Sequence, residues 1–178
     1  MSDTRDIQTI LSSPPFVVVE GVVNIRHLGG YAASDSQWVV KPMAIFRSGE
    51  PSSITEAGKE QLRALGVVKV FDLRSEQEIK QFKTASPTIE GIEMINAPVY
   101  TKDETFDPAN IEKLLKRFEA DEIGTGVRMY LDILDQAGPA FRVVFQHITH
   151  EPNNSCLVHC TSGKDRTGLF SALLLMVC

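Results

Sequence analysis

The chain has 178 residues, of which 43% are hydrophobic and 23% are charged, so its length and composition are those of one globular domain with a sizeable core. The formal net charge is −5. This charge argues against a general binder of nucleic acid or of membrane surfaces, because such proteins carry an excess of Lys and Arg. Any affinity for phosphate must therefore be local.

The sequence contains no signal-like start and no apolar run of membrane-spanning length, so we expect a cytoplasmic or nuclear location without stable membrane insertion. Cys156 and Cys160 would lie about 13 Å apart on one strand at about 3.3 Å per residue, which is too far for a disulfide. No second pair of metal ligands accompanies them. We expect neither a metal nor an organic cofactor.

In chain order, residues 3–13 fit a short helix before Pro14-Pro15, so residues 1–15 should form an N-terminal arm. Strands are predicted over 16–20, 38–40 and 44–46. The string Ser53-Ile54-Thr55-Glu56 fits a capping box, and Gly66 ends the helix that it opens.

Val67 to Leu73 reads as a strand buried on both faces, which is typical of a central parallel strand. Asp72 lies at its carboxyl end, where open α/β sheets place their ligands. The remaining predicted elements are a capped helix from Ser75 to Phe82, a strand over 92–99, helices over 111–118, 127–136 and 140–148 with Gly124-Thr125-Gly126 as a separator, and a strand over 156–159.

This alternation predicts an α/β fold of three layers, with a mostly parallel central sheet flanked by helices, over residues 16–178. The last helix, 169–178, is apolar nearly all round and needs cover on every side. We therefore expect this domain to be incomplete at its C-terminal end, and self-association through the exposed helix is expected.

The strand that ends at His159 runs into a Gly-containing loop, and the loop opens into the last helix near Asp165. Backbone N–H groups of such a loop and of the helix start converge on an anion, and Gly163 allows close approach of the backbone. A phosphate group is therefore expected to bind to Thr161, Ser162, Gly163, Lys164, Asp165 and Arg166.

Cys160 begins this loop, where the helix terminus and Arg166 should favour its thiolate, the nucleophilic form. The planar fork of Arg166 can bind two phosphate oxygens while the sulfur attacks phosphorus, so the pattern predicts phosphoryl transfer through a cysteinyl-phosphate. Thr167 could hydrogen-bond the sulfur, and His159 is expected to support the loop. A nucleotide-binding P-loop is disfavoured, because Val158 replaces its first Gly and Asp165 replaces its Ser or Thr.

The string His159-Cys160-Thr161-Ser162-Gly163-Lys164-Asp165-Arg166-Thr167-Gly168 resembles the signature of the cysteine-dependent tyrosine phosphatase superfamily, in its bacterial and fungal branch. Three further blocks share this resemblance over residues 22–178: Asn24-Ile25-Arg26-His27-Leu28-Gly29-Gly30, Arg47-Ser48-Gly49 and Asp72-Leu73-Arg74-Ser75. His27 departs from the Asp that is usual there. The resemblance implies a tyrosine-phosphatase-like fold and a phosphatase of phosphotyrosine, with phosphoserine, phosphothreonine or phosphoinositide as further substrates.

Phosphate ester hydrolysis needs a general acid, and several carboxylates compete for that role. Asp72 leads because it ends a central strand near the loop and because the aspartate of the resembled block aligns there, although it could instead accept hydrogen bonds at a helix N-terminus or pair with Arg74. Asp165 is second, and Asp103 and Asp107 also compete. Arg26, Arg47 and Arg74 could extend the positive lining or pair with carboxylates. Two other functions stay open, a catalytically silent phosphate-binding or interaction module and a sulfurtransferase.

Overall fold

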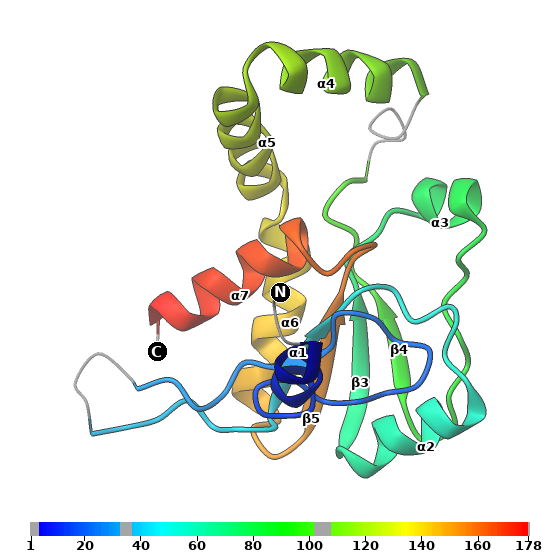
Figure 1. Cartoon of the computed structure of the whole chain (residues 1–178), viewed down its shortest axis with the longest axis vertical. Helices are drawn as coiled ribbons and strands as arrows, with labels where there is room; N and C mark the ends of the chain where they lie inside the picture. The colour runs from blue at the N-terminus through cyan, green and yellow to red at the C-terminus, as the bar shows by residue number, and fades with distance from the viewer. Residues whose placement is uncertain (1–3, 33–36, 102–107, 178) are drawn as a thin grey trace.

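The computed structural model describes residues 4–32, 37–101 and 108–177, which form an α/β fold around one sheet (Figure 1). Its strand order is β1-β2-β5-β3-β4. The strands are β1 (Arg26–His27), β2 (Ile45–Ser48), β3 (Val67–Asp72), β4 (Glu93–Asn96) and β5 (Ser155–His159). The β1–β2 pair is antiparallel, and the pairs β2–β5, β5–β3 and β3–β4 are parallel. The predicted, mostly parallel sheet is confirmed.

Helices cover both faces of this sheet. The helices of the described residues are α1 (Thr4–Leu11), α2 (Glu56–Ala64), α3 (Glu76–Phe82), α4 (Pro108–Ala120), α5 (Glu122–Gln136), α6 (Gly138–His150) and α7 (Asp165–Val177). Successive strand residues point to opposite faces, so Phe71 packs into a core with α6 and α7, while Val70 packs into a second core with α2. This arrangement is the three-layer fold expected from the sequence.

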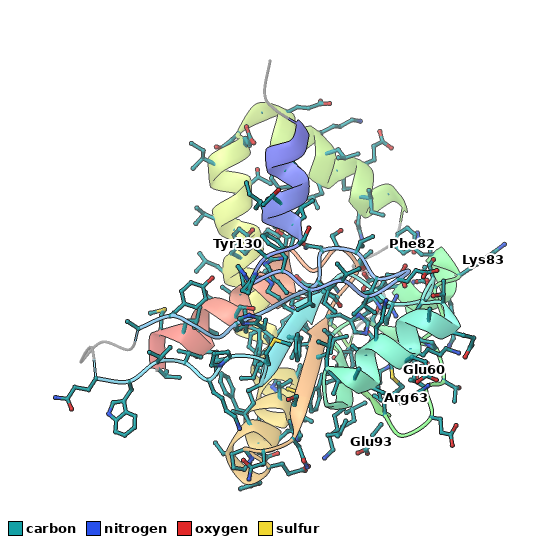
Figure 2. All side chains as sticks on the ribbon, turned by 60° about the horizontal axis from the view of Figure 1, so that its bottom comes forward. Glu60, Arg63, Phe82, Lys83, Glu93 and Tyr130 are labelled. Atoms are coloured by element: carbon teal, nitrogen blue, oxygen red, sulfur yellow. The ribbon has the colours of Figure 1, made fainter. Side chains whose placement is uncertain are left out.

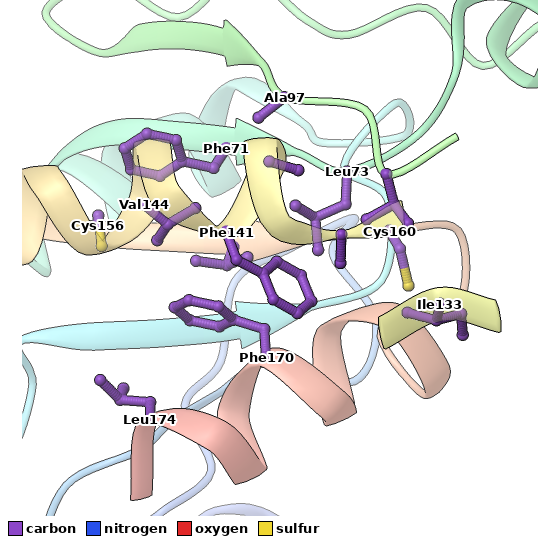
Figure 3. Close-up of a cluster of buried hydrophobic side chains, with 14 of the residues drawn as sticks. Phe71, Leu73, Ala97, Ile133, Phe141, Val144, Cys156, Cys160, Phe170 and Leu174 are labelled. Atoms are coloured by element: carbon purple, nitrogen blue, oxygen red, sulfur yellow. The ribbon is translucent and has the colours of Figure 1, made fainter. Parts of the chain in front are cut away.

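The core under α6 and α7 is built on aromatic side chains (Figure 3). Phe141 of α6 and Phe170 of α7 meet edge to face, with ring centroids 5.4 Å apart. Burying rings of this size stabilises the fold by about 3 kcal/mol or more each. The packing fixes α7, and therefore the loop that precedes it, against the sheet.

Local capping explains where α2 and α3 begin. The Thr55 side chain accepts a hydrogen bond from the Gly58 N–H, so the N-cap of α2 is Thr55 and not Ser53, the first residue of the predicted box. Ser75 caps α3 as predicted, because its Oγ accepts from the Glu78 N–H at 3.1 Å. Gly66 follows α2 with a φ of +77°, the left-handed conformation that glycine adopts without strain.

Two predicted strands are absent from the described residues. In the segment 16–20 only an isolated bridge between Phe16 and Arg26 forms, and near 38–40 the bridge joins Ala32 to Val39. Both segments are apolar, but neither packs along a neighbouring strand. Without a continuous partner, strand propensity alone does not produce a ladder.

Gly124-Thr125-Gly126 does not separate two helices, because all three residues lie inside α5. Asp121 caps this helix by accepting from the Gly124 N–H at 2.9 Å, and the Thr125 hydroxyl donates to the Arg117 carbonyl of α4 at 3.1 Å. The cap and the contact between the helices outweigh the cost of glycine in a helix, about 1 kcal/mol each.

Figure 1 shows α4 and α5 beyond the carboxyl ends of the parallel strands, on the side where the loop after β5 lies. The elements that can surround a ligand at this end are therefore the loop itself, α3, α4 and α5.

Within the described residues, no helix combines the length and apolarity needed to cross a membrane.

Candidate active site

The residues 160–166, called here the anion loop, leave the sheet at its centre. β5 lies between β2 and β3, and His159 is in register with Ser48 on one side and Asp72 on the other. The Leu73 N–H donates to the His159 carbonyl at 2.9 Å. Two neighbouring strands thus fix the point from which the loop begins.

Gly163 gives the loop its tight curvature. Its φ is +68°, and a Cβ built on it would lie 2.2 Å from the Ser48 carbonyl oxygen. Any other residue would force backbone to move at this point. On the opposite limb of the loop the Glu50 N–H donates to the Thr161 carbonyl at 2.9 Å.

Side chains outside the loop bind its carbonyl groups. Arg47 Nη2 donates to the Gly163 carbonyl at 2.6 Å, and Asn24 Nδ2 donates to the Ser162 carbonyl at 2.9 Å. In a trans peptide the N–H lies opposite the C=O. These contacts therefore leave the N–H groups of Gly163 and Lys164 on the other side of the loop, where they can bind an anion.

Cys160 lies at the start of the anion loop and is 3% exposed. Figure 3 shows its sulfur at the end of the apolar cluster, near Ile133. Its thiol is free, and the positive charges of Arg47 and Arg166 both interact with it electrostatically. Two cations therefore lie beside the sulfur that begins the anion loop.

Arg166 forms a bidentate pair with Glu78 of α3. Nη1 lies 2.7 Å from Oε2 and Nη2 lies 2.7 Å from Oε1. Glu78 is 1% exposed, and it also accepts a hydrogen bond from the Thr161 hydroxyl. Burial alone would lower the pKa of Arg166, but the Glu78 contact outweighs it and the pKa is raised. Arg166 therefore stays charged and oriented.

The contacts of Glu78 with the anion loop were not predicted, because the sequence around it indicates only a capped helix. A Glu three residues after a Ser cap ordinarily reaches back to the cap. Here its carboxylate instead binds Thr161 and Arg166, which lie 83 and 88 positions away. The capping pattern was a signal for the helix start and carried no information on this contact.

Asp72, the leading candidate for the general acid, forms a buried pair with Arg74. Asp72 is 3% exposed and Arg74 is fully buried, with Oδ2 2.7 Å from Nη2 and Oδ1 2.9 Å from Nε. Burial alone would raise the Asp72 pKa, but hydrogen bonds from Arg74 and the nearby His159 lower it. In this geometry Asp72 is an enclosed carboxylate paired with Arg74, so the predicted acid role of Asp72 and the predicted ligand role of Arg74 stay predictions.

Asp165, the second candidate, has the exposure that a general acid needs. Its side chain is 30% exposed at the start of α7, and it accepts a hydrogen bond of 2.8 Å from the Tyr130 hydroxyl of α5. Lys164 Nζ lies 3.7 Å from the same carboxylate oxygen, Oδ1. The competing Asp103 and Asp107 lie outside the described residues.

Two predicted residues take supporting positions instead of facing a ligand. Arg26 Nη1 donates to the Asn24 carbonyl at 3.0 Å, so it braces Asn24, which in turn holds Ser162. His27, where the resembled pattern has Asp, accepts from the Gly29 N–H at 3.1 Å and stabilises the turn there. Arg47, and not Arg26, is the arginine that contacts the anion loop directly.

His159 and Thr167 are fully buried behind the loop. His159 Nδ1 lies 3.2 Å from the Cys160 carbonyl, consistent with loop support, and burial lowers its pKa. The Thr167 hydroxyl has no hydrogen-bond partner in the described part of the chain, Cys160 Sγ included. Its predicted bond to the sulfur is therefore not formed in this structure.

In the described ranges, no three His, Cys, Asp or Glu side chains gather closely enough to hold a metal ion.

The groups assembled around the anion loop are a thiol, a fixed guanidinium, convergent N–H groups and a partly exposed carboxyl. Together they can bind a tetrahedral oxyanion, attack it and protonate a leaving oxygen.

Comparison with known proteins agrees with this chemistry. Residues 17–178 match the tyrosine phosphatase family, and the chain therefore belongs to that family. It is 31% identical over 142 residues to a tyrosine-protein phosphatase of Nostoc commune, covering 74% of this chain and 42% of the relative. It is 29% identical over 161 residues to the triple specificity protein phosphatase PtpB of Mycobacterium tuberculosis, covering 80% and 58%. The chain spans about half the length of these curated relatives.

Proposed function

We propose that this chain hydrolyses phosphate monoesters, phosphotyrosine first among them, through a phosphate bound covalently to Cys160. The observation that carries the proposal is the pairing of Cys160 with Arg166 across one tight loop, with the guanidinium held by Glu78. Family membership and the names of the relatives support it.

In the first step the Cys160 thiolate attacks phosphorus, and an S–P bond forms as the P–O ester bond breaks. Loop N–H groups and Arg166 bind the equatorial oxygens, where charge is stabilised during transfer. Asp165 gives its proton to the departing ester oxygen. The alcohol or phenol leaves, and the phosphate remains on sulfur.

In the second step water attacks the same phosphorus. The Asp165 carboxylate takes a proton from this water, and the S–P bond breaks with its electron pair returning to sulfur. Inorganic phosphate is released, and both the Cys160 thiolate and the Asp165 acid are restored. The orphaned hydroxyl of Thr167 is available to stabilise the departing sulfur during this step.

Substitution of the two cysteines tests the proposal. Cys160→Ser should abolish hydrolysis of para-nitrophenyl phosphate while the protein still binds vanadate or phosphate, because the loop N–H groups remain. The matched control is Cys156→Ser on the same strand, whose thiol is 1% exposed and has a pKa raised by burial to about 12. Turnover by Cys160→Ser, or loss of turnover in Cys156→Ser with the fold intact, would contradict the assignment.

Phosphoinositides are a second substrate class, favoured by the position of Lys164. Its side chain is 75% exposed at the rim of the anion loop, where an ammonium can meet a second phosphate group. Lys164→Ala should then reduce hydrolysis of a phosphoinositide more than that of a phosphotyrosine peptide, with a difference that shrinks in high salt. An equal reduction on both substrates would leave phosphotyrosine as the sole assignment.

A further inference from the structure

A groove of about 710 Å³ runs from the anion loop outward between α4 and α5. Asp165 and Arg166 line its inner end, together with the Tyr100 ring. Figure 2 labels Tyr130 on α5 and Phe82 at the end of α3, two helices that border this end of the molecule. A substrate whose phosphate group is bound in the anion loop must therefore extend through or beside this groove.

One face of α4 forms the first wall. Asn110, Lys113, Leu114 and Arg117 line the groove, and spacings of three and four residues place them on one side of a helix. Lys113 and Arg117 are exposed, one turn apart. Within the described residues, neither has a carboxylate within ion-pairing distance, and no hydrogen bond occupies their charged ends. This wall offers two cations to a ligand.

One face of α5 forms the second wall, by the same spacing, and it contributes Thr125, Arg128, Met129, Asp132 and Ile133. Arg128 is partly engaged, because its Nη2 lies 3.3 Å from Asp121 Oδ2. Burial raises the pKa of Tyr100, and a hydrogen bond from its hydroxyl to Asp132 adds to this rise. Among the described residues, the groove charges without an ion-pair partner are therefore the two cations of α4 and the Asp132 carboxylate, and Asp132 is already hydrogen-bonded by Tyr100 and Gln136.

We propose that this groove binds the residues beside the phosphorylated residue of a peptide, and that Lys113 and Arg117 select acidic side chains there. This inference rests on the proposed phosphatase function. Each wall spans about 10 Å, at about 1.5 Å per helical residue. An extended peptide rises about 3.3 Å per residue, so three of its residues match the wall.

The lining favours a peptide over a lipid tail. Charged groups stand on both walls among the apolar ones, Lys113 and Arg128 included. An acyl chain would cover these groups without hydrogen-bonding them, which is costly. A peptide backbone can donate to and accept from such groups while an aromatic or aliphatic side chain packs on Leu114 and Met129.

The experiment compares kcat/KM for two phosphotyrosine peptides that differ only in having Glu or Gln on both sides of the phosphotyrosine. The wild-type chain should favour the Glu peptide by about threefold to tenfold at low salt. The double variant Lys113→Ala, Arg117→Ala should reduce this ratio to about one, as should salt high enough to screen exposed charges. The control Lys116→Ala should keep the ratio, because Lys116 lies on α4 outside the groove and pairs with Glu112 at 2.7 Å.

Equal hydrolysis of both peptides by the wild type would overturn the inference, as would a preference that survives in the double variant. The inference would also be overturned by a double variant that keeps its peptide preference but loses activity on phosphoinositide vesicles, since the groove would then be a lipid site. Hydrolysis of para-nitrophenyl phosphate separates the two proposals: without it the phosphatase function itself fails, whereas hydrolysis without peptide discrimination contradicts the groove alone.

Discussion

Glu78 and Arg166 face each other with two hydrogen bonds of 2.7 Å, and both side chains are buried. The guanidinium fork is therefore fixed before a phosphate arrives. An arginine oriented in advance loses little rotamer freedom on binding, which is how positioning contributes to catalysis. Through this pair α3 controls the geometry of a loop that is distant in sequence.

Glu78→Gln should weaken both catalysis and folding. Removing one charge of a buried pair leaves Arg166 uncompensated, at a cost of about 3 kcal/mol in the free energy of unfolding. The value of kcat/KM for para-nitrophenyl phosphate should fall by roughly tenfold or more, because the fork loses its fixed orientation. Urea unfolding and steady-state kinetics measure the two effects. Glu76→Gln, an exposed residue of α3 paired with Lys80, should change neither.

Asp165→Asn should slow the hydrolysis of alkyl phosphates by about a hundredfold or more and that of para-nitrophenyl phosphate far less, because a good leaving group needs little protonation. Asp72→Asn is the matched control. It should lower stability by breaking the pair with Arg74, with equal kinetic losses on both substrates. If Asp72→Asn showed the steep dependence on the leaving group and Asp165→Asn did not, the acid assignment would be reversed.

Tyr130→Phe should reduce kcat for alkyl phosphates by roughly fivefold, the effect of one hydrogen bond to a charged group at a partly exposed site. The Tyr130 hydroxyl donates to Oδ1 of Asp165 and thereby fixes the orientation of the carboxyl group that we propose as the acid. The hydrogen bond to Asp165, with some burial, raises the pKa of Tyr130, so the hydroxyl remains a donor at neutral pH. Leu131→Ala, at the next and exposed position of α5, should leave the ratio of alkyl to aryl rates unchanged.

Lowering the pH should reduce the free energy of unfolding, and the protonation of His159 in the unfolded chain should be the first cause of this loss. Burial lowers the pKa of His159 in the folded chain, although Asp72 opposes this shift. The unfolded chain therefore binds the extra proton at about pH 6.5 and the folded chain does not, so stability falls as pH decreases below that value. Thermal unfolding between pH 8 and 5 measures the slope. His159→Gln should flatten it, and a slope unchanged by that substitution would remove His159 as its cause.

The local parts of the site could be predicted from the sequence because they depend on neighbours along the chain. Cys160, Gly163 and Arg166 share one loop, and a buried strand and an apolar helix flank it. Ser75 caps α3 by accepting a hydrogen bond from the N–H of Glu78, three residues further along the chain. For such features, side-chain type and spacing determine most of the geometry.

The parts that the sequence did not reveal depend on contacts between distant segments. The pairing of Asp72 with Arg74 was one of the alternatives that the sequence left open, but nothing near Asp72 indicates that the Ser86 hydroxyl also donates to its carboxylate. Nothing near Tyr130 indicates that its hydroxyl reaches Asp165, because that contact requires α5 to pack beside α7. Tertiary packing decided which carboxyl is exposed, and with it the choice of candidate acid.

The central claim is a phosphate carried on Cys160, and rapid acid quenching tests it most directly. The chain is mixed with a labelled aryl phosphate, quenched within the first turnover, digested and analysed by mass spectrometry. The account predicts a phosphorylated peptide that contains Cys160, formed in up to about one equivalent per chain as the phenol is released. Steady release of phenol and phosphate with no phosphate on Cys160 at any quench time would contradict it.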